Sequence, residues 1–82
     1  MRIVTANPSK NQLFVLSHDE KIRAAACVIR SLDGRTMYEG AIDFELGLSL
    51  SNLSMVSGVY MIELYISETN ETLHQQFVYL KE

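Results

Sequence analysis

The 82-residue sequence has little of what small domains commonly use to hold themselves together. Cys27 is the only cysteine, so no disulfide can form within the chain. With only two histidines to add, a metal site built from Cys and His ligands is not expected either. Residues 1–82 have room for one domain with one core, and 48% of them are hydrophobic. We therefore expect the packing of apolar side chains to stabilise the fold.

Positive charge and long apolar runs are also scarce. The net charge is −3, which has the wrong sign for a general nucleic-acid binder. Residues 1–38 hold six basic and three acidic side chains, whereas residues 39–82 hold one basic and seven acidic ones. No apolar run approaches the roughly 20 residues that span a bilayer, and the first residues lack the apolar stretch of a signal peptide. We expect no direct membrane insertion, and any export signal would lie on a longer parent chain.

The basic residues of the first half allow two interpretations. A basic patch for an acidic partner is one, and its members would be Lys21, Arg23, Arg30 and Arg35. The other is that interleaved strands bring the two halves together, so that their charges neutralise each other on the sheet surface. The second interpretation needs no partner.

A period of two dominates the hydrophobic pattern. The clearest run covers residues 60–66, where Tyr, Ile, Leu and Ile alternate with Met, Glu and Tyr. Shorter alternations occur at residues 12–15 and 48–51, and a last one at 73–79 is interrupted only by a glutamine. A first short strand is expected at about residues 2–6. This spacing is typical of strands with one buried face.

Turn signals separate these runs. The turn-forming segments are Asn7–Asn11, Asp33–Gly34, Ser57–Gly58 and Glu68–Glu71. Asp33–Gly34 indicates a tight hairpin between a strand around residues 27–30 and a strand around residues 35–39. Residues 21–30 contain three alanines and fit a helix or a strand, but β-branched Val28 and Ile29 lead directly into the hairpin and favour a strand. About seven short strands result. The sequence therefore predicts an all-β fold, a small immunoglobulin-like β-sandwich.

Residue types with catalytic potential do not form a site. Ser17, His18 and Asp19 are adjacent in sequence, and such neighbours point in divergent directions, whereas a triad is assembled across space. Cys27 sits in an apolar run and is expected to be a buried core residue. His74 is expected on an exposed face. Phosphate-cradling glycine loops and metal-ligand spacings are missing. We expect no enzyme activity, no metal and no cofactor.

Several weak motifs follow one another in a recognisable order. They are Asn7-Pro8-Ser9, then Ile29-Arg30-Ser31-Leu32-Asp33-Gly34-Arg35, then Leu53 followed by Gly58-Val59-Tyr60, and finally Gln76-Phe77-Val78. This order resembles the C-terminal sorting domain of proteins exported by the type IX secretion system of Bacteroidota, in its type A form. That family shows an N-P-x-x-x-G opening, a D-x-x-G-R segment, a leucine followed by G-x-Y, and a closing K-F-V strand. The resemblance runs from about Val4 to Lys81.

The resemblance implies a sorting signal at the end of a larger parent protein. The family-motif residues, and so the candidates for recognition, are Asn7, Pro8, Gly34, Arg35, Gly58, Tyr60, Phe77, Val78 and Lys81. Their expected partners are the outer-membrane translocon and the sortase of the type IX system. The parent cargo would pass through the periplasm and be secreted or attached to the cell surface.

Two further expectations come from the residues themselves. A sandwich this small has open sheet edges, and we expect the terminal strands, about residues 2–6 and 73–80, to form them. An open edge can bind another strand, so the domain is expected to dock or to form a homodimer through it. The alternative function is an adhesion or carbohydrate-binding module of fibronectin III or immunoglobulin type. Against sugar binding, the chain lacks Trp, and Tyr38, Tyr65 and Tyr79 are scattered.

Overall fold

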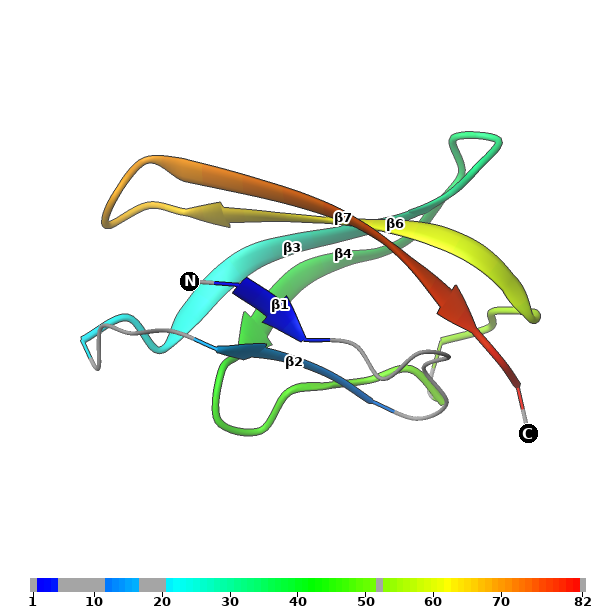
Figure 1. Ribbon diagram of the computed structural model, residues 1–82, viewed down its shortest axis with the longest axis horizontal. Coiled ribbons are helices and arrows are strands. Elements are labelled where there is room, and N and C mark those ends of the chain that lie inside the picture. The colour runs from blue at the N-terminus through cyan, green and yellow to red at the C-terminus, as the bar shows by residue number, and fades with distance from the viewer. Residues whose placement is uncertain (1, 5–11, 17–20, 52, 82) are drawn as a thin grey trace.

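All regular secondary structure that the structure describes is β-strand (Figure 1). The computed structural model describes residues 2–4, 12–16, 21–51 and 53–81. The strands are β1 (Arg2–Val4), β2 (Gln12–Leu16), β3 (Ala24–Ser31), β4 (Thr36–Asp43), β5 (Leu48–Ser49), β6 (Gly58–Ile66) and β7 (Glu71–Tyr79). The all-β prediction is confirmed, as is the strand prediction for the alanine-rich segment. Within these residues, no helix is long and apolar enough to cross a membrane.

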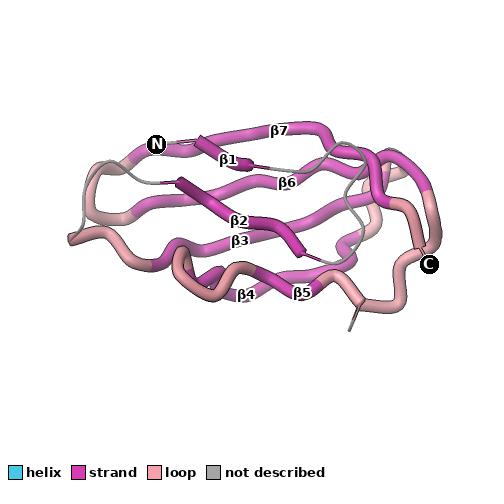
Figure 2. The backbone as a smooth tube through the Cα atoms, turned by 60° about the horizontal axis from the view of Figure 1, so that its bottom comes forward, coloured by secondary structure: helices cyan, strands magenta, loops and turns pink. Residues whose placement is uncertain are grey.

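The strands form two antiparallel sheets that lie face to face (Figures 1 and 2). One sheet has the order β1-β2-β5, and the other has the order β4-β3-β6-β7. β5 contributes only two residues, which pair with the first two of β2. The small sandwich expected from the spacing of strands and turns is therefore present.

β6 is one of the two central strands of the larger sheet and shows the strictest alternation. It pairs with β3 along six residues and with β7 along its whole length. Tyr60, Ile62, Leu64 and Ile66 are all buried, whereas none of the residues between them is. Because successive strand side chains point to opposite faces, this run turns one complete face of β6 towards the other sheet.

The core combines the inner faces of both sheets with side chains from the connecting segments. The smaller sheet gives Leu13 and Val15, and the connections give Ile22, Leu50 and Met55. The larger sheet gives Ala25, Cys27, Ile29, Ile42, Tyr60, Ile62, Leu64, Ile66, Phe77 and Tyr79. The burial expected of Cys27 is confirmed.

β4 differs from its expected extent. The sequence placed a strand at about residues 35–39, but β4 continues to Asp43 and is an edge of its sheet. Its burial does not alternate, because the register against β3 shifts between Ile29 and Arg30 and leaves Met37 without a register partner, so that Met37 and Tyr38 are both half-buried. The Tyr38 side chain lies over Gly40 and donates its hydroxyl to the Ala41 carbonyl oxygen at 2.7 Å. A turn then ends at Gly47, whose φ of +75° favours glycine.

The terminal strands are sheet edges, as predicted. β7 is an edge of the larger sheet and begins at Glu71, two residues earlier than expected. β1 is an edge of the smaller sheet and covers the first part of the expected strand at residues 2–6. Figure 2 draws these two strands next to each other, so both edges lie on the same side of the sandwich.

Hydrogen exchange of backbone amides tests the edge assignment. Every second amide of an edge strand points away from its only partner, so alternate amides between Leu73 and Leu80 should exchange fast in the monomer. The amides of β6, which is bonded on both sides, should exchange slowly throughout. Uniformly slow exchange along β7 would contradict the assignment of a free edge.

Candidate recognition surface

Most family-motif residues lie at one end of the sandwich. Asn7 and Pro8 lie outside the described residues. The other seven come from the β3–β4 turn (Gly34, Arg35), the start of β6 (Gly58, Tyr60) and the end of β7 (Phe77, Val78, Lys81). Antiparallel pairing brings these segments together, since Tyr60 is the register partner of both Ser31 and Phe77. Residues more than 40 positions apart in sequence thus share one surface.

The β3–β4 turn is tight because of its glycine. The Gly34 amide donates to the Ser31 carbonyl oxygen at 3.0 Å, and Gly34 has a φ of +91°. A side chain would strain that backbone conformation, so glycine is favoured at this position. The Ser31 amide then bonds to the Arg35 carbonyl oxygen at 2.9 Å and closes the hairpin. The hairpin predicted from Asp33-Gly34 is confirmed.

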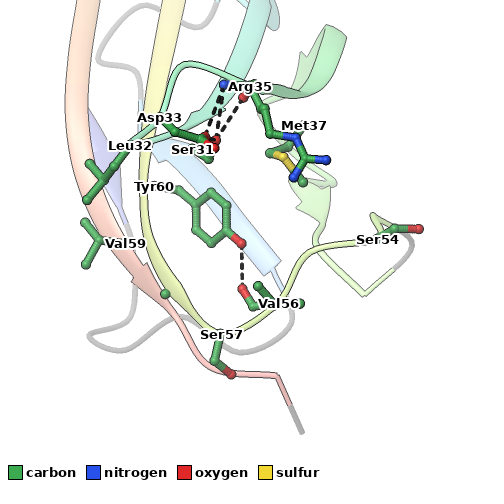
Figure 3. Close-up of a pocket in the computed structure, with 11 residues that line it drawn as sticks. Ser31, Leu32, Asp33, Arg35, Met37, Ser54, Val56, Ser57, Val59 and Tyr60 are labelled. Carbon is green, nitrogen blue, oxygen red and sulfur yellow. Dashed lines mark hydrogen bonds between the residues drawn. The ribbon is translucent and has the colours of Figure 1, made fainter.

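A side-chain network stabilises the turn from inside. The Ser31 hydroxyl donates to the Asp33 carboxylate, and the Arg35 amide approaches both side chains (Figure 3). The Ser31 hydrogen bond is the main reason why the pKa of Asp33 lies below its ordinary value, with a second contribution from the Arg35 amide. Asp33 therefore stays ionised at neutral pH and is engaged by its own turn.

Tyr60 connects the larger sheet to the segment before β6. Its ring is only 4% exposed and contacts the rings of Phe77 and Tyr79, at centroid distances of 6.0 and 6.3 Å. Its hydroxyl donates to the Val56 carbonyl oxygen at 2.6 Å (Figure 3). The ring is thus buried while its hydroxyl holds the segment before β6.

The end of β7 is fastened to the same segment. Val78 and Val59 are register partners on β7 and β6. Beyond the strand, the Lys81 amide donates to the Ser57 hydroxyl at 2.9 Å. The backbone at Lys81 thus lies at the entrance of β6, next to the loop that Tyr60 holds.

The β3–β4 turn, the start of β6 and the segment before it line a hollow of about 440 Å³, which we call the end hollow (Figure 3). Its apolar lining residues are Leu32, Met37, Val56, Val59 and Tyr60. Its polar lining residues are Ser31, Asp33, Arg35, Ser54 and Ser57, with Gly58 beside them. Arg35, Gly58 and Tyr60 were candidates from the sequence. Met37, Ser54 and Val56 were not, because they belong to no motif and only the fold brings them together.

Exposed apolar side chains cluster around the same end. Leu32 and Val56 are 67% and 69% exposed, and Val59 and Val78 are each 37% exposed. Figure 3 shows Leu32 close to Val59 on the side of β6 away from Tyr60. The sequence signal for this cluster was present but weak, since it consists of apolar residues at turn and strand-end positions.

Other candidate residues are dispersed. Arg30 lies 3.6 Å from Glu63 on the neighbouring strand, as the interpretation of mutual neutralisation expects. Lys21 and Arg23 precede β3, whereas Arg35 follows it, so the four basic residues do not form one patch. The Ser17-His18-Asp19 segment lies outside the described residues. His74 is exposed, as predicted, and lies 3.9 Å from Glu63.

Comparison with known proteins yields no relative from which a function could be transferred. No family model, no curated protein and no solved structure matches the chain. The candidate surface combines a hydrogen-bonded hairpin, an anchored tyrosine and a hollow with one arginine.

Replacing Tyr60 with Phe tests whether the hydroxyl anchors the loop. The Tyr60→Phe variant loses one hydrogen bond at a buried ring, so its free energy of unfolding should fall by about 1 kcal/mol. The matched control is Tyr65→Phe, which removes an exposed hydroxyl contact to Asn70 and should cost less. Urea denaturation followed by circular dichroism measures both. Equal losses in the two variants would contradict the anchoring role.

The reactivity of Cys27 tests its burial. Cys27 is 1% exposed, and burial raises the pKa of its thiol to about 12. At pH 8 iodoacetamide should label the thiol slowly in the folded domain and rapidly in urea. Because the folded state holds this proton more tightly than the unfolded state, stability should fall as the pH rises from about 9 towards 12. The Cys27→Ala variant should lose less stability over that range. Rapid labelling of the folded domain would contradict burial.

Proposed function

We propose that this domain is a sorting signal of the type IX secretion system, recognised by the outer-membrane translocon at the C-terminal end of a cargo protein. In this role the domain performs no chemistry. The cargo upstream crosses the outer membrane because the domain is bound, and a sortase then usually removes the domain and attaches the cargo to the cell surface.

The observation that carries the proposal is the gathering of ordered motifs on one surface. The D-x-x-G-R-like and G-x-Y segments are far apart in sequence, yet residues of both line the end hollow. The F-V segment does not line it, but pairs with the G-x-Y segment on the neighbouring strand. Part of this arrangement is structural, because Gly34 and Tyr60 serve the turn and the core. Arg35 and the exposed apolar cluster have no such task, and they favour contact with a partner protein.

The free edge of β7 offers a second means of docking. Strand addition gives affinity through main-chain hydrogen bonds and makes few demands on sequence. The edge ends beside the end hollow, so one partner could contact both. We propose that β7 takes part in docking to the translocon and that the isolated domain can form a homodimer through the same edge.

The alternative, a carbohydrate-binding module, is less well supported. Such modules stack sugars on exposed aromatic rings. The exposed rings of this chain are those of Phe14 and Tyr65, and they belong to strands of different sheets. Tyr79 is buried. A shared aromatic platform is therefore not formed.

A fusion experiment tests the sorting function. A periplasmic reporter with an ordinary signal peptide is joined to residues 1–82 and expressed in a bacterium that has a type IX system. We expect the reporter at the cell surface, detected by antibody labelling of intact cells and by protease accessibility.

Two controls make the result specific. The same fusion in a strain without the translocon should remain in the periplasm, and so should the reporter without the domain. Deleting residues 73–82 should also abolish export, but this deletion removes core residues and unfolds a small domain, so it is uninformative alone. If the intact, folded fusion stays in the periplasm of the competent strain, the proposal is wrong.

A further inference from the structure

We propose that the end hollow binds an acidic side chain of a partner peptide, with Arg35 pairing to the carboxylate and the apolar walls receiving a neighbouring apolar side chain. The inference deepens the proposed function and rests on it in naming the partner: the translocon would present an acidic and apolar segment. The site itself is argued from the chemistry of the hollow.

The Arg35 guanidinium is available for an ion pair with a partner. Among the described residues, the Arg35 side chain has no ion pair. Asp33 is close enough to interact with it electrostatically, but the Asp33 carboxylate accepts hydrogen bonds from Ser31 and from the Arg35 backbone amide. The guanidinium fork therefore keeps its five N–H donors for another acceptor, and its planar shape matches a carboxylate.

The Arg35 side chain lies beside an apolar part of the hollow. Arg35 and Met37 are two residues apart in the chain and both line the hollow, and Figure 3 shows their side chains on the same side. A carboxylate that pairs with Arg35 would therefore lie on the side of the apolar Met37 side chain.

The apolar lining of the hollow favours a peptide over a free anion as the ligand. Half of the lining is apolar, and Leu32 and Val56 are each about two-thirds exposed. A small anion would leave these side chains in water, whereas a peptide with an apolar residue next to its acid would cover them. The hollow is also bounded by rigid features, namely the β3–β4 turn and the loop held by Tyr60. A preformed site loses little conformational freedom on binding.

Peptide titration followed by NMR tests the site on the whole domain. The probes are pairs of capped pentapeptides, acetyl-Ala-X-Glu-X-Ala-amide and acetyl-Ala-X-Gln-X-Ala-amide, where X is Leu, Ile, Val or Phe. We expect amide shifts centred on residues 31–37 and 54–60. At least one Glu peptide should bind roughly three- to fivefold more tightly than its Gln partner, the effect of a partly exposed ion pair, and added salt should reduce the difference.

Two variants assign the charge effect. Arg35→Gln should abolish the preference for Glu over Gln while leaving the fold intact, since the side chain has no ion pair within the described residues. Arg23→Gln makes the same chemical change before β3, at the far end of that strand, and should leave the preference unchanged. Circular dichroism and urea midpoints verify that both variants are folded.

Each contrary outcome overturns the inference. Binding without a preference for Glu, or a preference that persists in Arg35→Gln, removes the ionic contact. Acetate alone producing the same shifts makes the hollow a free-anion site. Shifts that depend only on domain concentration make it a contact between two copies, and a panel that produces no shifts rejects a peptide site.

The secretion assay separates this inference from the proposed function. If the wild-type fusion is exported and Arg35→Gln is exported equally well, the sorting function stands and the role of the end hollow in it fails. If the wild-type fusion is not exported, the sorting function fails, and the titration alone decides whether the hollow recognises acidic peptides. We expect export of the Arg35→Gln fusion to be reduced and export of the Arg23→Gln fusion to be unchanged.

Discussion

The register of β6 is the constraint on which the rest of the structure depends. This strand is hydrogen-bonded on both sides and buries every second side chain from Tyr60 to Ile66. A shift of one residue would expose the four buried side chains of Tyr60, Ile62, Leu64 and Ile66 to water. It would also bring Glu63 and Met61 into the core. Since the chain has no disulfide, and its described residues contain no group of acidic, His or Cys side chains that could hold a metal ion, this burial has no substitute.

The same register creates the surface at the end of the sandwich. With Tyr60 inward, its hydroxyl reaches the Val56 carbonyl oxygen and its ring meets Phe77. Val59 must then point outward, opposite Val78 on β7. Tyr60 and Val59 thus lie on opposite faces of one strand end, and both contribute to the lining of the end hollow. Tyr60 therefore packs in the core and also positions the segment before β6, although its own side chain is inaccessible to a partner.

The sequence was informative where structure is local and less so where it is not. Alternation predicted β6, and Asp33-Gly34 predicted the hairpin, because both depend on neighbouring residues. The length of β4 could not be predicted, since this edge strand shows no alternation and its register against β3 shifts near its start. Burial of Met55 was equally invisible: it lies in a connection with no period and is covered only by the assembled sheets. The end hollow depends on such connections, which is why its lining was only partly foreseen.

The family motif contains residues that the fold requires and residues that are free to contact a partner, and the structure distinguishes the two. Gly34 is needed by the backbone of its turn, and Phe77 by the aromatic contact within the core. Such residues would recur in any sequence with this fold, whatever binds it. Arg35 belongs to the same motif, yet its guanidinium has no structural task within the described residues. A charged side chain kept beside an apolar hollow gives the domain little stability, because an exposed charge without a partner contributes almost nothing to folding. Arg35 is therefore the motif residue on which we base the proposed recognition of an acidic partner.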